Sequence, residues 1–184
     1  MNDQDLYSLR YPIGDFAYGS VFTPEQTQAH IAEIAGLPKK LTELIGKWGD
    51  DRLGTPYRPE GWTVRQVAHH VVDSHINAYV RTKLALTEEN PTISPYGEGE
   101  WAKLPDYQLD VAPSLVILSN LHHRWVAVLN SLTEPQLQRT YFHPGLKRSF
   151  PLSEVIGLYA WHGEHHYQHV YQLAIRNGWL GKNV

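Results

Sequence analysis

Cysteine is missing from this sequence: none of its 184 residues is one. That absence excludes a disulfide framework, a thiolate metal ligand and a cysteine nucleophile, and it fits a cytoplasmic location, which we expect. No apolar run approaches the about 20 residues of a transmembrane helix, and the N-terminus lacks the basic and then apolar segments of a signal peptide. The formal net charge is only −3, so there is no positive excess to attract nucleic acid. We therefore expect neither a membrane nor a nucleic acid as a partner.

Histidine, by contrast, is abundant. The chain has 11 histidines, which gather at positions 69–70, at 122–123 and between 162 and 169. Histidine is the commonest metal ligand and the usual proton carrier near neutral pH. A random scatter of surface histidines is the alternative, but grouping within helical periods favours a site.

The pattern of caps and apolar residues predicts a single domain, residues 1–184, that is an all-α four-helix bundle. An extended arm is expected over residues 1–22. Capping boxes begin at Thr23 and Thr63, and Asn177-Gly178 is a typical helix end. The expected helices span 24–46 (kinked or broken at Pro38), 63–86, 113–132 and 153–177. A long loop covers 88–112, and residues 139–152 form a small hairpin or a loop.

Two histidines of the last helix are candidate metal ligands. With about 100° of rotation per residue, His162 and His166 fall on the apolar, core-facing stripe, whereas His165 and His169 look outward. Imidazoles at i and i+4 on one face can converge on one ion. The metalloprotease base is missing, because Gly163 follows His162. Hydrogen-bonded core histidines without a metal remain the alternative.

A third ligand is expected from His70, on a polar face of the helix 63–86. Its neighbours are types that line polar pockets rather than solvated faces: Gln66, Asp73, Ser74, Asn77 and Arg81. Three histidine ligands with an open position are the catalytic arrangement for zinc. Imidazoles also suit nickel, so we expect one divalent ion, Zn or Ni. Asp73, one turn from His70, is a candidate for orienting a ligand.

Several segments resemble one family. They are Tyr11-Pro12-Ile13-Gly14, Thr55-Pro56-Tyr57-Arg58, Gly61-Trp62-Thr63-Val64-Arg65-Gln66-Val67, His69-His70, Asp73-Ser74-His75, 83–89, 123–125, 141–144 and 157–162. Together they resemble the DinB-like four-helix-bundle superfamily, and more closely its YfiT-type branch, described as metal-dependent hydrolases and as bacillithiol S-transferases. The resemblance covers nearly the whole chain. It implies His70, His162 and His166 as metal ligands and a homodimer.

Three functions follow as hypotheses. The first is transfer of a low-molecular-weight thiol, bacillithiol by resemblance, to an electrophile, because a metal can hold a thiol as the nucleophilic thiolate. Candidate groups for binding these small-molecule substrates are Arg65, Asn77 and Arg81, with Arg58. The second is hydrolysis of amides or esters, for which Asp73 or Glu164 would be the base. The third is a non-catalytic, metal-stabilised module whose fourth ligand is His69 or His169.

The region around the site is open to two interpretations. The aromatic residues Trp62, Tyr159 and Trp161 either form the wall of a substrate pocket or pack in the core, and core packing is the commoner role of such residues. The long loop 88–112, with Tyr96 and Trp101, is a candidate lid over the site.

Overall fold

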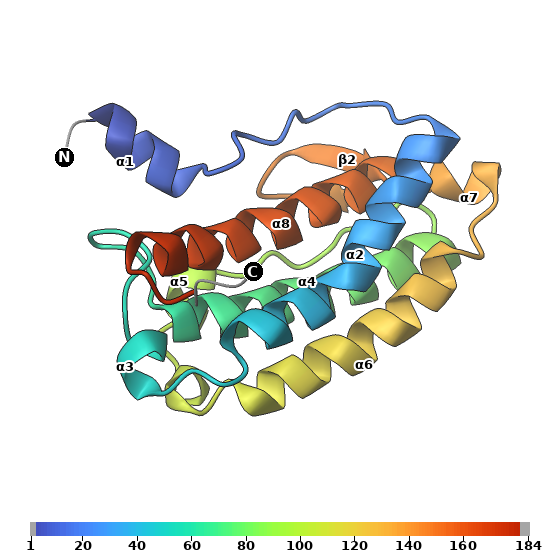
Figure 1. The fold of residues 1–184 in the computed structure, drawn as a ribbon. Helices are drawn as coiled ribbons and strands as arrows, with labels where there is room; N and C mark the ends of the chain where they lie inside the picture. The colour runs from blue at the N-terminus through green and yellow to red at the C-terminus, as the bar shows by residue number, and fades with distance from the viewer. Residues whose placement is uncertain (1–2, 181–184) are drawn as a thin grey trace.

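Four long helices form the body of the computed structural model, which describes residues 3–180 (Figure 1). They are α2 (Pro24–Ile45), α4 (Val64–Thr87), α6 (Ala112–Leu129) and α8 (Leu152–Arg176). Short helices lie in the connections: α1 (Asp3–Arg10), α3 (Asp50–Leu53), α5 (Glu98–Trp101), the 3₁₀ helix η1 (Pro105–Gln108) and α7 (Glu134–Leu137). The predicted four-helix bundle is confirmed.

The segment before α8 is a small antiparallel hairpin of β1 (Thr140–His143) and β2 (Arg148–Pro151). Tyr141 pairs with Phe150 in its register, and both side chains are buried against the bundle. The hairpin is one of the two structures expected here, and each of its strands has one buried residue among half-buried ones.

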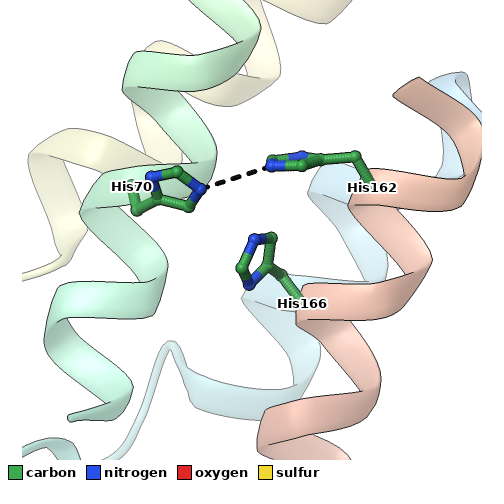
Figure 2. Close-up of side chains that lie close together, drawn as sticks. All are labelled: His70, His162 and His166. Atoms are coloured by element: carbon green, nitrogen blue, oxygen red, sulfur yellow. Dashed lines mark hydrogen bonds between the residues drawn. The ribbon is translucent and has the colours of Figure 1, made fainter. Parts of the chain in front are cut away.

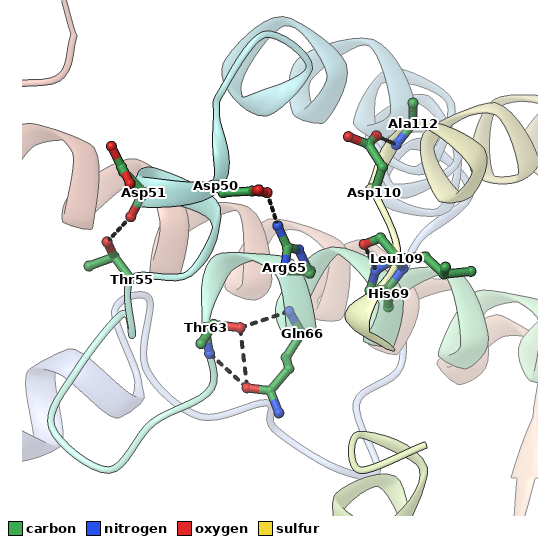
Figure 3. A network of polar contacts seen from close by, with 10 residues as sticks. All are labelled: Asp50, Asp51, Thr55, Thr63, Arg65, Gln66, His69, Leu109, Asp110 and Ala112. Carbon is green, nitrogen blue, oxygen red and sulfur yellow. Dashed lines mark hydrogen bonds and ion pairs between the residues drawn. The ribbon is translucent and has the colours of Figure 1, made fainter. Parts of the chain in front are cut away.

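Capping boxes begin two of the long helices, as the sequence predicts. At the start of α4, Thr63 Oγ1 accepts from the Gln66 backbone N–H at 3.2 Å, and Gln66 Oε1 accepts from the Thr63 N–H at 3.0 Å (Figure 3). Thr23 and Gln26 form the same pair at α2. These bonds satisfy backbone donors that the first turn leaves without partners. The start of α4 is thereby fixed six residues before His70.

Pro38 does not break α2, which continues unbroken from Pro24 to Ile45. Pro38 lies in the middle of the helix, and its side chain is buried. Because proline has no backbone N–H, the carbonyl of Ile34, four residues earlier, lacks its usual intrahelical partner. The Ile34 oxygen instead accepts a hydrogen bond from His122 Nδ1 at 2.6 Å.

The N-terminal segment differs from the extended arm that was expected. Residues 3–10 form α1, with Asp3 and Asp5 in the first turn and Arg10 in the last, charges that complement the helix dipole; residues 1–2 lie outside the described part. The segment after α1 runs along α8 (Figure 1). Trp161 Nε1 donates to the Gly14 carbonyl at 3.2 Å. The arm thus covers the face of α8 that helical periodicity assigned to solvent.

Close packing between α2 and α8 depends on Gly163. A Cβ atom there would lie 2.6 Å from Leu37 Cδ2. A larger residue at this position would therefore require the Leu37 side chain to move.

None of the helices within residues 3–180 combines the length and apolar character needed to span a membrane.

Candidate metal centre

Helices α4 and α8 bring three histidine rings together inside the bundle. His70 projects from α4, and His162 and His166 project from successive turns of α8, with the rings pointing toward one another (Figure 2). His70 Nε2 lies 3.3 Å from His162 Nε2. One ring nitrogen from each residue lies within 4.8 Å of the others. The structure therefore brings together all three residues that the sequence selects.

The distances fit one shared ion. Two nitrogens bound to a tetrahedral zinc at about 2.0–2.1 Å lie about 3.4 Å apart, close to the separation of His70 Nε2 and His162 Nε2. Ser74 Oγ lies 3.4 Å from His162 Nε2, at the edge of the same space. Three nitrogens and an open side match the donor set of a catalytic centre rather than a closed structural one.

Burial keeps these imidazoles neutral, which metal binding requires. Only 5% of the His70 surface and 8% of the His166 surface are exposed. Burial, with a smaller contribution from the charge of His165, lowers the pKa of His70 to about 4. Burial and the neighbouring histidines also hold the pKa values of His162 and His166 well below the usual range. At pH 7 each ring has a free lone pair on one nitrogen.

A cavity of about 640 Å³ opens onto the three rings. Its lining includes the three aromatic residues considered as a pocket wall, Trp62, Tyr159 and Trp161. The Trp62 ring lies 4.6 Å from His70, between ring centroids. Cavities of this size, with an apolar wall and a few polar groups, are typical of small-molecule sites.

Neither of the two carboxylates considered as bases lines this cavity. Asp73 accepts a hydrogen bond from the Tyr107 hydroxyl at 2.7 Å, and burial raises its pKa. Glu164 lies on the outward face, as helical periodicity indicated, and pairs with Lys40 at 3.1 Å. Both carboxylates are thus engaged on other sides of their helices.

Of the candidate substrate-binding residues, the structure brings one to the cavity. Arg81 is buried in the cavity lining and donates to the Ser94 carbonyl at 3.0 Å. Arg65 instead pairs with Asp50 at the junction of α3 and α4 (Figure 3). Asn77 donates to the main-chain oxygen of Asp73 at 2.9 Å. Arg58 donates to the neighbouring Pro59 carbonyl at 2.9 Å.

The expectation that His165 and His169 look outward is wrong. Both are buried, because the N-terminal segment covers that face of α8. His169 Nε2 bonds the Arg10 carbonyl at 3.0 Å, and its Nδ1 lies 3.4 Å from His166 Nδ1. His165, His166 and His169 also bring three nitrogens within 4.8 Å, but this second group shares His166 with the first.

The fourth-ligand candidates are engaged away from the open side. His69 Nδ1 bonds Ser114 Oγ at 2.7 Å, and its Nε2 bonds the Leu109 carbonyl at 3.2 Å (Figure 3). His169 reaches the site only through His166. Instead of a fourth protein ligand, the cavity lies next to the three rings.

Sequence reasoning missed several cavity residues: Arg10, Tyr11, Tyr18, Glu98, Tyr141 and His143. They come from the N-terminal segment, the hairpin and the loop between α4 and α6, where no periodic pattern indicates orientation. Glu98, in that loop, is the one carboxylate of the described residues in the lining. The loop expected as a lid therefore does border the cavity.

Residues 33–170 match the DinB superfamily, so the chain belongs to this superfamily. Similarities to individual proteins are consistent with this superfamily. Proteins of Bacillus cereus strain AH820 and Bacillus anthracis strain CDC 684 are each 52% identical to this chain over 179 residues, which is 97% of this chain and 100% of the relative; both carry the name "Putative metal-dependent hydrolase". The solved structure of YfiT from Bacillus subtilis superposes with a TM-score of 0.91 at 44% identity, covering 94% of this chain and 99% of that one. It is described as "a probable metal-dependent hydrolase with an unusual four-helix bundle topology".

Proposed function

We propose that this chain is a metal-dependent enzyme that holds one divalent ion, Zn or Ni, with His70, His162 and His166. The observation that carries the proposal is the convergence of three neutral, buried or half-buried imidazoles in the lining of a cavity. The His70 Nε2 and His162 Nε2 atoms lie 3.3 Å apart, close to the separation of two nitrogens that share one zinc ion. The names of the relatives, which refer to metal dependence, support the same proposal.

The reaction we favour is transfer of a low-molecular-weight thiol to an electrophile, with bacillithiol as the thiol that the family resemblance implies. When bound, the metal would lower the pKa of a substrate thiol and favour the nucleophilic thiolate. A thiol with a pKa near 8.5 needs only a small lowering of its pKa to ionise at neutral pH, whereas bulk water, with a pKa of about 15.7, needs a large one. The sulfur then forms a bond to the electrophilic carbon, the leaving group departs with its electron pair, and the thiol proton passes to solvent.

The chain's own residues would bind and orient the substrates. Arg81 and Arg10 supply positive charge in the cavity lining, which suits an anionic thiol. Trp62 and Trp161 supply flat apolar surfaces for the electrophile. The two carboxylates expected as bases for hydrolysis are engaged elsewhere, which is why thiol transfer comes first.

Hydrolysis of amides or esters is the second candidate, favoured by the names of the relatives. It needs a base near the attacking water. Glu98 is the carboxylate in the lining that would fill this role. The non-catalytic module is the weakest candidate, because its proposed fourth ligands are engaged and a cavity lies beside the rings.

Two assays on metal-loaded protein separate these functions. One measures conjugation of bacillithiol, cysteine and glutathione to a chromogenic electrophile; the other measures hydrolysis of simple esters and amides without thiol. Conjugation that disappears in His70→Ala and His166→Ala supports the first function. Hydrolysis without thiol that falls in Glu98→Gln supports the second. Unchanged metal content in both histidine variants overturns the ligand assignment.

The homodimer implied by the resemblance stays a prediction. Light scattering coupled to gel filtration tests it directly: a mass near twice the 21.0 kDa chain is expected, and a mass of one chain would contradict it.

A further inference from the structure

A row of buried imidazoles extends behind His162, away from the cavity. His162 Nδ1 lies 3.2 Å from His75 Nε2, and His75 Nδ1 lies 2.8 Å from His122 Nε2. His122 Nδ1 in turn lies 2.6 Å from the Ile34 carbonyl oxygen. His75 and His122 are 0% and 1% exposed, with their rings nearly parallel at 4.9 Å between centroids. The row joins α8, α4, α6 and α2.

The carbonyl at its end gives the row a direction. A carbonyl oxygen only accepts, so His122 must donate from Nδ1. The Nε2 of a neutral His122 then accepts, so His75 donates from its Nδ1. By the same step His75 Nε2 accepts from His162 Nδ1, which leaves His162 Nε2 with a free lone pair facing His70. Burial lowers the pKa of His122 to about 4, which keeps it neutral at pH 7.

Pro38 explains why this carbonyl is available. In an uninterrupted helix the Ile34 oxygen would accept the backbone N–H of residue 38, which proline lacks. The freed acceptor lies inside the bundle, where an unpaired oxygen would be costly. His122, from the neighbouring helix α6, satisfies it.

We propose that the Ile34 carbonyl, acting through His122 and His75, holds His162 in the tautomer whose Nε2 lone pair faces the metal position. His75 and His122 are therefore positioning residues that touch neither substrate nor metal. This proposal adds detail to the proposed metal site and rests on that site for its functional meaning. The tautomer itself is a property of the metal-free chain and can be measured there. Partners that orient metal-ligating histidines in this way typically change metal affinity about 10–100-fold.

A shorter version of the same arrangement stands behind His166. The Arg10 carbonyl accepts from His169 Nε2 at 3.0 Å, and His169 Nδ1 faces His166 Nδ1 at 3.4 Å. This arrangement assigns the proton to His166 Nδ1 and leaves its Nε2 free as the ligand.

Nitrogen-15 NMR of the metal-free full-length chain, labelled at histidine, tests the proposal without substrate. We expect the ring proton of His162 on Nδ1 in the wild type. His122→Leu removes the acceptor for His75, so we expect the row to reverse and the proton to move to His162 Nε2. His122→Gln keeps an acceptor oxygen at the position of Nε2, and the wild-type tautomer should return. His123→Gln is the matched control: it changes the neighbouring, exposed histidine of α6 and should alter nothing.

Titration calorimetry with Zn²⁺ and Ni²⁺ supplies the second measurement. His122→Leu should weaken binding about 10–100-fold, whereas His122→Gln and His123→Gln should bind as the wild type does. A proton on Nε2 of wild-type His162, or a folded His122→Leu variant with wild-type affinity, overturns the proposal. If His122→Leu does not fold, the wild-type tautomer alone decides. If wild-type His162 carries its proton on Nδ1 but the metal-loaded protein shows no catalysis, only the proposed function is overturned.

Discussion

At the scale of single residues, the three candidate ligands differ in how their second nitrogen is used. His166 faces His169, which bonds a main-chain carbonyl, whereas His162 faces His75, which reaches a main-chain carbonyl only through a further histidine. His70 Nδ1 is buried without a hydrogen-bond partner in the described part of the chain. Asp73, expected to orient a ligand, is held by Tyr107 instead. The two α8 ligands are therefore the preorganised ones, and His70 completes the site.

Removal of a ligand should reduce both metal content and metal-dependent stability. In His166→Ala we expect the metal content to fall from about one ion per chain to near zero, because two imidazoles alone bind weakly. A metal ion whose free concentration is about 100 times its Kd stabilises the folded protein by about 2.7 kcal/mol. For a chain of this size that corresponds to a rise of about 5–11 °C in Tm. Elemental analysis and melting with and without Zn²⁺ measure the change.

The matched control is His123→Ala, at an exposed histidine of α6. It should keep both the ion and the thermal shift. A His166→Ala variant that still melts higher with Zn²⁺ would contradict the assignment.

Charge in the cavity should decide which thiols bind. Arg81 is buried in the lining, so Arg81→Gln should raise the KM for an anionic thiol about tenfold or more, since a hydrogen bond to a charged group contributes about 1.5–3 kcal/mol. The KM for an uncharged thiol should change much less. Arg65→Gln, which alters an arginine paired with Asp50 outside the cavity, should leave both KM values unchanged. Equal losses for charged and uncharged thiols would assign Arg81 to packing.

At the scale of elements, Glu154 joins three segments. Its carboxylate, 1% exposed at the start of α8, accepts from the Gly19 backbone N–H at 2.7 Å and pairs with Arg148 of β2. Glu154→Ala leaves a partly buried arginine and a backbone donor without their acceptor, so we expect a loss of about 2–4 kcal/mol. Urea denaturation measures it. Glu164→Ala removes a more exposed pair with Lys40 and should cost about 1 kcal/mol or less; similar losses in the two variants would contradict this view.

The long helices were predictable because their signals are local. Capping residues and apolar periodicity place all four within three residues of their observed ends. Similar local reasoning selected the three histidines that the structure brings together: His162 and His166 from the core-facing stripe of their helix, and His70 from a polar face of its helix. It failed for His165 and His169, since a helical wheel assumes one buried face and α8 has two.

The remaining features depend on contacts between distant segments. The N-terminal segment, the hairpin and the loop before α6 supply cavity residues such as Glu98 and His143, and none of these segments has a period that fixes orientation. Arg65 and Arg81 are both arginines of the same predicted helix, and the sequence gives no reason to treat them differently. Arg65 pairs with Asp50 only because α3 packs beside the start of α4. The pairing of His75 with His122 likewise needs the register of α4 against α6.

At the scale of the whole molecule, most of the histidines of α4, α6 and α8 are buried, and burial keeps them uncharged near pH 7. Burial lowers the pKa values of His70, His122 and His165 to about 4 and that of His169 to about 3. An unfolded chain would titrate these groups near 6.5. Between these values the unfolded state binds protons that the folded state does not, so the free energy of unfolding falls as the pH falls from about 6.5 toward 4.

The metal-free protein should therefore lose stability at unusually mild acidity. Each such histidine contributes a slope of up to about 1.4 kcal/mol per pH unit, and several act together. Urea denaturation at pH 7.5, 6.0 and 5.0 should show a midpoint that falls with pH and most steeply between pH 6.0 and 5.0, before carboxylates with pKa values near 4 titrate. Saturating Zn²⁺ should raise the midpoint at all three pH values, because the folded ligand rings have pKa values of about 4 or well below the usual range and stay neutral there, so protons do not displace the ion. A midpoint that is constant from pH 7.5 to 5.0 would mean that these rings bind protons in the folded chain as they do in the unfolded one, and would contradict the prediction.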